Sequence, residues 1–315
     1  MKIRRGFNDL VRPLIQEIQT AHTPDSLAES LREEAGVVLL RTSAFDSPSA
    51  RYSFVTAKPF LTFRSTGSRC EISPVAADVR RRIAGTPDSF NPPPYVGGYV
   101  QFGNPWHILD SLMARCELLD EVDLPFPLGG CFGYWGYDLR NFVEPKLPRR
   151  AINDLELPDC HVGFYDSLVV FDHQLGKTWI VSTGLAADGS RSETRAEEQM
   201  QFWREQLNQS EAPVRDETLE HLPPLPGERA EVKSNLSRSN FLNSVTRAQN
   251  YIRAGDIYQV NLSHRLTAPC DLSGWELFQQ LGAVSPAPFS AFFDCGDLQI
   301  ASSSPEQFLR MSGSQ

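Results

Sequence analysis

The feature that most constrains the fold is a series of short apolar runs, rich in β-branched and aromatic residues and separated by turn residues. The runs are residues 36–42, 51–63, 129–137, 161–172 and 178–183. Runs of this length and composition predict strands. Gln-Leu-Gly-Lys between the last two predicts a β-hairpin. Many short strands and few helices predict an α+β fold, with large, mostly antiparallel sheets packed together and helices outside.

A polar stretch at residues 186–229 predicts a linker between two domains. It contains a helical pattern at residues 191–208 that is polar nearly all round and is therefore expected on the surface. It ends in Pro223, Pro224, Pro226 and Gly227. Prolines and charged residues cannot build a core, so the predicted domains are residues 1–227, with the linker from about residue 186, and residues 228–315.

Beyond this boundary the pattern predicts a helix. Ser239 can cap its N-terminus, and Gly255 follows its last turn, where a left-handed residue commonly ends a helix. Further helices are predicted over residues 26–34 and 273–281. The apolar residues that recur at helical spacing after Ser239 are Phe241, Val245, Ala248 and Ile252.

Residues 257–266 alternate in the manner of a strand. Val260, Leu262 and Leu266 share one face. The other face is either a solvated face of an edge strand or the lining of a cleft for a polar substrate. Two more strands are predicted at residues 288–294 and 298–303. The polar face consists of Gln259, Asn261, Ser263 and Arg265.

Charge and cysteine content exclude several classes of protein. The 315-residue chain has a net charge of −9 and a pI near 5.2, so nucleic acid and anionic membranes repel it. It has no apolar run of about 20 residues that could span a membrane, and no apolar stretch of a signal peptide follows Lys2, Arg4 and Arg5. Its 6 cysteines lie far apart, without a Cys-x-x-Cys pair. We therefore expect reduced thiols in a cytoplasmic protein.

The glycines and histidines offer little sign of a common cofactor site. The chain has no phosphate loop, dinucleotide fingerprint or His-Glu-x-x-His motif. Aromatic residues between Gly129, Gly130 and Gly133 predict a closely packed strand rather than a nucleotide loop. His161 and His173 flank a strand pattern and are expected at the surface.

A carboxylate follows the last predicted strand. Three serines, Ser302 to Ser304, lead into Pro305 and Glu306. A carboxylate just after a strand end can be held rigidly by the sheet, which suits general acid–base catalysis. A glutamate after a proline is also the usual start of a helix.

Four segments together resemble the chorismate-binding enzymes. Residues 254–263 and 303–308 are similar to that family's chorismate-binding domain. Residues 129–138 and 162–166 are similar to the N-terminal domain shared by the anthranilate and aminodeoxychorismate synthases. The resemblance runs from roughly residue 30 to the last residue. It implies the fold of these synthases, incomplete at the C-terminus.

Within the family, Asn261 and the segment Pro288-Phe289-Ser290 are more similar to the aminodeoxychorismate synthase branch. That branch replaces the 4-hydroxyl of chorismate with an amino group, for 4-aminobenzoate and folate biosynthesis. The resemblance implies Glu306 as general acid and base, a bound magnesium ion, and ammonia from a glutamine amidotransferase subunit. The alternatives are anthranilate synthase component I, which serves tryptophan biosynthesis, and a non-catalytic fragment that binds an amino acid or a partner.

The chain also departs from the family pattern. The family's nucleophilic lysine follows the Ser-Pro-Glu segment, whereas no lysine follows Lys233 and the sequence ends at Gln315. The family's magnesium ligands are expected beyond this end as well. Gln307 stands where the family usually has arginine. We therefore expect a C-terminally truncated chain that is inactive alone.

The resemblance implies a second site, in which relatives hold tryptophan between the N-terminal domain and the Pro-Phe-Ser segment. Thr42 has a hydroxyl where relatives have serine, so a hydrogen bond to the ligand can persist. The same residues could instead simply pack a domain interface. The wall of this pocket would consist of Thr42, Ser49, Ala50, Arg51, Tyr52, Pro288, Phe289 and Ser290.

Overall fold

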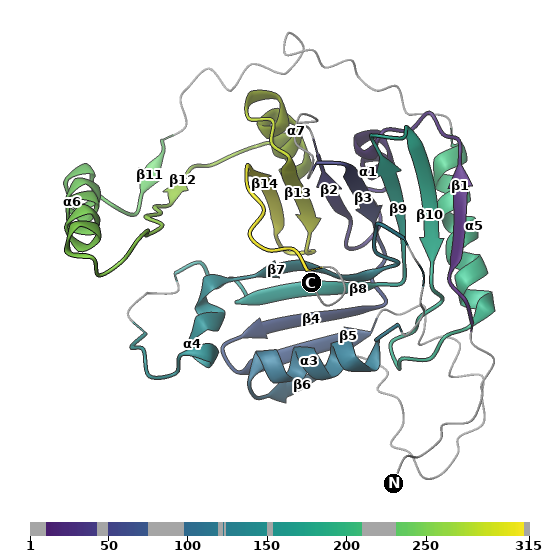
Figure 1. Cartoon of the computed structure of the whole chain (residues 1–315), viewed down its shortest axis with the longest axis horizontal. Helices are drawn as coiled ribbons and strands as arrows, with labels where there is room; N and C mark the ends of the chain where they lie inside the picture. Colours follow the sequence, from purple (N-terminus) through teal and green to yellow (C-terminus); the bar gives the residue numbers. More distant parts are fainter. Residues whose placement is uncertain are drawn as a thin grey trace. The chain divides into compact units, whose positions relative to one another are not determined.

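The protein is described by a computed structural model (Figure 1). The structure describes residues 11–42, 50–74, 98–118, 122, 124–149, 154–209 and 231–311. The chain divides into two compact units, Met1–Arg215 with Phe278–Gln315, and Asp216–Leu277. The boundary predicted after residue 227 lies outside the described residues.

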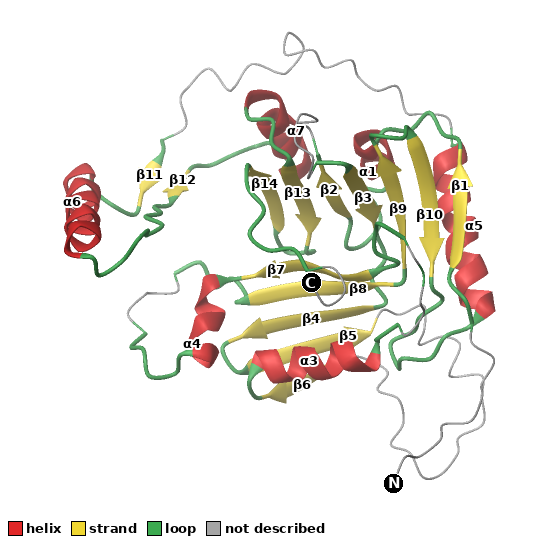
Figure 2. Cartoon of the chain, viewed as in Figure 1, coloured by secondary structure: helices red, strands yellow, loops and turns green. Residues whose placement is uncertain are grey.

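The first unit contains a seven-stranded sheet in the order β1-β10-β9-β3-β2-β13-β14 (Figure 2). Each of its strand pairs is antiparallel. The predicted hairpin at residues 174–177 is confirmed, since it joins β9 to β10. The strands, in that order, are Leu14–Ile18, Lys177–Ser182, Ser167–Asp172, Tyr52–Thr56, Val38–Arg41, Phe289–Asp294 and Gln299–Ser304.

A five-stranded sheet, also antiparallel, completes the first unit in the order β6-β5-β4-β8-β7. The glycines of β7 pack closely as predicted, because a Cβ on Gly133 would collide with the carbonyl oxygen of His161. The α+β architecture with large antiparallel sheets is therefore confirmed. The strands are Tyr99–Phe102, Arg69–Pro74, Leu61–Thr66, Cys160–Tyr165 and Gly130–Trp135.

Two runs predicted as single strands each divide between the two sheets. Residues 51–63 form β3 in one sheet and β4 in the other, and residues 161–172 form β8 and β9 in the same way. Buried Asp166 stands at the second break, where its carbonyl oxygen accepts from the amide of Thr183 at 2.8 Å and its carboxylate accepts from Arg195 Nε at 2.7 Å. The strand prediction for these runs is confirmed, but an apolar run does not show where the chain changes sheets.

Helices of the first unit cover these sheets. They are α1 (Pro24–Ser30), α3 (Pro105–Arg115), α4 (Arg140–Val143), α5 (Glu193–Asn208) and, from residue 278 onward, α7 (Gly274–Val284). The helix α5 was predicted to be polar nearly all round and to lie on the surface. Many of its residues are exposed, but one face packs on the sheet strands β9 and β10 and is buried. That face consists of Ala196, Met200, Trp203 and Leu207.

One apolar core cluster of the first unit lies between α3 and the five-stranded sheet. Ile108, Leu109 and Leu112 from the helix meet Phe63 and Ile72 from the sheet. The cysteines of the chain are all free, as predicted. No helix in the described part of the chain is long and apolar enough to cross a membrane.

The second unit contains α6 (Arg238–Ala254) and the short strands β11 (Lys233–Ser234) and β12 (Leu266–Thr267), which pair with each other. Ser237 caps α6 in place of Ser239, because its hydroxyl accepts from the Asn240 amide at 3.2 Å. Gly255 ends the helix at a φ of 79°, as predicted.

The prediction of a strand at residues 257–266 was wrong. Residues 257–265 have no strand structure, and only Leu266 and Thr267 form a two-residue strand. The proposed polar face does not exist as a strand face, and Gln259, Asn261 and Ser263 are exposed. A strand is stabilised by its partners, and in the described part of this unit only β11 provides one.

Candidate functional site

Four strand ends meet at one end of the seven-stranded sheet. Arg41, at the end of β2, pairs with Ser290 of β13, and Phe289 pairs with Ser304 at the end of β14. On the other side, Leu40 of β2 pairs with Phe54 of β3, so Tyr52 at the start of β3 lies at this same end. The registers therefore bring the predicted tryptophan-pocket residues and the segment leading to Glu306 to one end of one sheet.

Thr42 follows β2 at the centre of this sheet end. It is buried, and its amide donates to Ser53 Oγ at 3.1 Å. Ser53 Oγ in turn lies 2.7 Å from His173 Nε2. Thr42 Oγ1 is buried and has no hydrogen-bond partner among the described residues. A buried hydroxyl without a partner costs free energy, so this atom could accept or donate a hydrogen bond to a ligand.

Arg51 forms the strongest electrostatic contact of the site. Its Nε donates to both carboxylate oxygens of Asp172, at 3.1 and 3.0 Å, and its Nη2 donates to Oδ2 at 2.6 Å. The Asp172 side chain is 1% exposed and the Arg51 side chain 32% exposed. The guanidinium is thus committed to Asp172, in the planar geometry that arginine forms with carboxylates.

The protonation states of this network follow from burial and hydrogen bonding. Burial opposes ionisation of Asp172, but donors from Arg51, Leu175 and Gln174 outweigh it and lower the pKa of the carboxyl. Burial also lowers the pKa of His173, although the nearby carboxylates Asp172 and Asp25 oppose this shift. At neutral pH the site therefore holds an ionised carboxylate beside a neutral imidazole.

An aromatic group closes one side of the sheet end. The Tyr52 ring lies edge-on to Phe126 at a centroid distance of 5.9 Å, and the Arg51 guanidinium lies over the Tyr52 ring at 4.8 Å from its centroid. Burial raises the pKa of the Tyr52 hydroxyl. Its oxygen, like Thr42 Oγ1, is buried and unpaired within the described ranges.

The other side is formed by the turn before β13. Ser290 is buried, and its hydroxyl donates to the Ala287 carbonyl at 3.1 Å. Pro288 and Phe289 are half-buried beside it. Ala50 is buried before β3, and Ser49 lies outside the described residues.

Glu306 lies two residues beyond β14 and is exposed. Its carbonyl oxygen accepts from Ser304 Oγ at 3.2 Å, which fixes the backbone just after the strand. The following Phe308, Leu309 and Met311 are also exposed, at 93%, 78% and 84%. A carboxylate at the surface is surrounded by water. Glu306 could therefore act as a general acid only where a substrate or further protein covers it.

Asp172, His173 and Ser53 are the members of this site that the sequence did not suggest. His173 was expected at the surface, whereas it is half-buried against Ser53. The signal available in the sequence was weak: an acidic residue and a histidine follow an apolar run just before a hairpin turn. The polar residues of 257–265 belong to the second unit.

The described residues do not supply a magnesium site. Among them, no group of three or more His, Cys, Asp or Glu side chains is arranged to hold a metal ion. A magnesium ion needs several oxygen ligands in near-octahedral geometry. The magnesium that the resemblance implies therefore has no ligand set among these residues.

Comparison with known structures first defines the class of fold. The crystal structure of anthranilate synthase component I from Streptococcus pneumoniae TIGR4 superimposes with a TM-score of 0.55 at 24% sequence identity. The match covers 84% of this chain and 52% of the other. The chain therefore has the α+β fold of that protein.

The sequence comparison then names the family. Residues 58–315 match the family of chorismate binding enzymes, so this chain belongs to that family. It is 28% identical to anthranilate synthase component 1 of Acetivibrio thermocellus, over 95% of this chain and 57% of that protein. It is 30% identical to aminodeoxychorismate synthase component 1 of Escherichia coli K12, over 88% of this chain and 52% of that protein. The chain spans about half the length of the curated relatives it matches.

Proposed function

We propose that this chain is part of an aminodeoxychorismate synthase component I, which converts chorismate to 4-amino-4-deoxychorismate for 4-aminobenzoate and folate biosynthesis. Membership in the family of chorismate binding enzymes supports the substrate. Asn261 and the segment Pro288-Phe289-Ser290, which are similar to the aminodeoxychorismate branch, support the reaction.

The observation that carries the proposal is the place of Glu306. It follows the β13–β14 hairpin directly, in the Ser-Pro-Glu segment, and its backbone is tied to Ser304. Hydroxide is a poor leaving group, and a carboxyl that gives it a proton lowers the barrier to its departure. Glu306 would therefore protonate the departing 4-hydroxyl and later accept a proton from the incoming amine.

Other parts of the reaction come from outside the described residues. By similarity a lysine attacks the ring, and this chain has no lysine after Lys233. A covalent adduct of that kind divides one difficult displacement into two easier ones. A glutamine amidotransferase subunit would supply ammonia, and the two relatives compared above are both named as component 1 of a synthase.

The sheet end around Thr42 would bind free tryptophan as a second ligand. Two buried oxygens without a hydrogen-bond partner among the described residues, Thr42 Oγ1 and Tyr52 Oη, support this proposal, since each gains a hydrogen bond when a polar ligand enters. We expect tryptophan to raise the melting temperature of the chain, and Thr42→Val to abolish the rise. Val preserves the shape of the side chain, so a variant that still responds to tryptophan would contradict this assignment.

The alternative function is that of anthranilate synthase component I. The relative of that name from Thermus thermophilus is 37% identical, over 61% of this chain and 38% of that protein. The two reactions differ in product, since one yields 4-amino-4-deoxychorismate and the other 2-aminobenzoate.

The test uses the protein expressed from the uninterrupted reading frame that contains this chain. Chorismate, ammonium and magnesium are supplied, and the products are separated and identified by mass. We expect 4-amino-4-deoxychorismate, and 2-aminobenzoate as the main product would favour the alternative. Binding of chorismate without any product would favour a non-catalytic binding protein.

Glu306→Gln tests the assigned role in the same assay. The substitution keeps the size of the side chain but removes its proton transfer, so turnover should fall by about 10²-fold or more with little change in chorismate binding. Glu197→Gln, on the exposed side of α5, is the matched control and should leave turnover unchanged. Normal turnover by Glu306→Gln would exclude Glu306 as the acid.

A further inference from the structure

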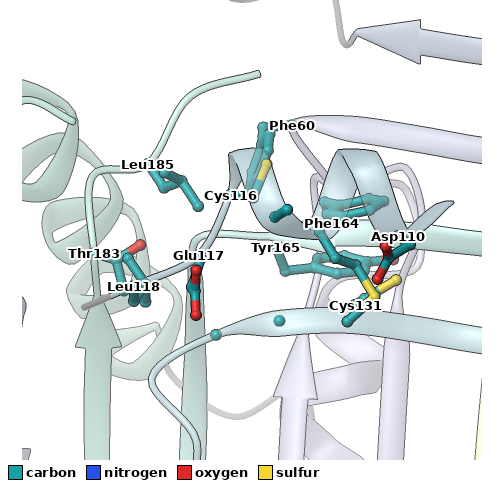
Figure 3. A pocket seen from close by; sticks show the side chains of 14 residues that line it. Phe60, Asp110, Cys116, Glu117, Leu118, Cys131, Phe164, Tyr165, Thr183 and Leu185 are labelled. Atoms are coloured by element: carbon teal, nitrogen blue, oxygen red, sulfur yellow. The ribbon is translucent and has the colours of Figure 1, made fainter. Parts of the chain in front are cut away.

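A cavity of about 460 Å³ lies beside the C-terminal half of α3, apart from the sheet end described above (Figure 3). One stripe of the helix and its first following turn faces it: Asp110, Met113, Ala114 and Glu117. These positions are spaced i, i+3, i+4 and i+7, so they share one side of the helix. The cavity has the volume of sites that hold small organic molecules.

The opposite wall is mainly apolar. The side chains of Phe60, Phe164, Leu118 and Leu185 contribute to it, and the Thr183 hydroxyl is already engaged with the Asp166 carbonyl at 3.0 Å. Such a wall favours a ligand with an aromatic or aliphatic body, because binding removes apolar surface from water.

The two cysteines that line the cavity carry no charge at neutral pH. Burial raises the pKa of Cys131 to about 12. Burial raises the pKa of Cys116 as well, although Arg115 opposes this shift. The thiols therefore behave as small apolar groups of the wall.

The charge of the lining has one sign. Among the described residues that line it, Asp110 and Glu117 are the acidic side chains, and none is a lysine, arginine or histidine. Neither carboxylate has a hydrogen bond or ion pair with another residue in the described ranges. Figure 3 draws Glu117 and Asp110 at different ends of the row of labelled side chains. The lining thus offers two carboxylates that have no partner among the described residues.

We propose that this cavity binds an organic ammonium ion with an apolar body. The ammonium group lies against Asp110 or Glu117, and the body fills the space between α3 and the Phe60, Phe164 and Leu185 side chains. A dicarboxylate such as chorismate is repelled by the same two carboxylates. The site is therefore distinct from any site for the proposed substrate, and its test does not depend on catalytic activity.

The experiment is a calorimetric titration of the 315-residue chain with three probes of similar shape. They are 2-phenylethylammonium, the neutral 2-phenylethanol and the anion 3-phenylpropionate. We expect the ammonium to bind most tightly, the alcohol more weakly and the anion not at all. Equal affinity for the ammonium and the alcohol, or the absence of ammonium binding, would overturn the proposal.

Substitutions locate the binding within the cavity. Asp110→Asn and Glu117→Gln both replace exposed carboxylates, and the two together should weaken ammonium binding by about two- to fivefold for each carboxylate that contacts it. Ala114→Trp, on the same exposed stripe of α3, should occupy the cavity and abolish binding of both the ammonium and the alcohol. Glu197→Gln on α5 removes the same charge elsewhere and should change nothing. Unaltered affinity in the Asp110→Asn, Glu117→Gln double variant would refute the site.

Discussion

Residues 257–266 and residues 288–304 were both predicted as strands from their sequence pattern, and only the second segment forms them. Residues Phe289–Asp294 and Gln299–Ser304 form a hairpin whose first strand pairs with β2. Residues 257–265 show the more regular alternation but have no strand structure. The difference is the partner, since β2 of a large sheet offers its edge to β13. The alternation of apolar and polar residues shows which side chains would share a face of a strand. Whether the strand forms depends on a neighbouring strand with which it can pair.

The largest expected difference in stability between the two segments lies at the core of the hairpin. Phe292 of β13 is 3% exposed, and its ring packs on Phe278 at a centroid distance of 5.8 Å. We expect Phe292→Ala to lower the free energy of unfolding by about 3 kcal/mol or more, through lost burial and a cavity. Denaturation in urea measures this. Val260→Ala, at a side chain 44% exposed in the segment without a strand, should change it by less than about 0.5 kcal/mol. Equal losses in the two variants would contradict the difference between the segments.

Asp172→Asn tests how much the ion pair between Arg51 and Asp172, at the end of the same sheet, contributes to stability. The Asp172 side chain is 1% exposed and loses its charged partner contact with Arg51 in this variant, so the free energy of unfolding should fall by more than it does on losing a fully exposed ion pair. Asp297→Asn is the matched control, because that carboxylate is 57% exposed in its pair with Arg64. Its loss should stay below about 1 kcal/mol. A loss for Asp172→Asn as small as that of the control would show that the buried pair contributes nothing to stability.

Ser237→Ala tests which serine caps α6 in the second unit. Ser237 accepts from the Asn240 amide and caps α6, so we expect a loss of about 1 kcal/mol in the unfolding of that unit. Ser239→Ala should cost less, because Ser239 does not cap the helix. Hydrogen exchange of the α6 amides reports the two effects separately. The reverse order of the two variants would restore Ser239 as the cap.

The smallest expected effect is on the pH dependence of stability. The ordinary pKa of His173 is 6.5, and burial lowers it in the folded protein. The unfolded chain therefore binds a proton more readily below about pH 6.5, and stability falls as the pH decreases through this range. His173→Gln should reduce that slope. The check is a series of urea titrations between pH 5 and 8, and an unchanged slope in His173→Gln would exclude this contribution.

Local patterns correctly predicted most elements of the first unit. The hairpin between β9 and β10, the packed glycine strand β7 and the last two strands all appear near their expected positions. The burial of one face of α5 was missed, because Ala196, Met200, Trp203 and Leu207 are few among many charged residues. In the candidate site, resemblance pointed to the Thr42 and Ser290 segments, while Asp172 and His173 were missed because their contacts with Arg51 and Ser53 span more than a hundred residues.

The sequence alone determined the local features of this protein, where neighbouring residues decide the outcome. The turn at Gly176 and the left-handed helix end at Gly255 depend on backbone freedom that glycine supplies by itself. The tertiary structure decided which sheet each strand joined, where two apolar runs changed sheets, and that residues 257–265 form no strand. The physical reason is that strand pairing and burial are made with partners far along the chain, so no pattern within one segment contains them.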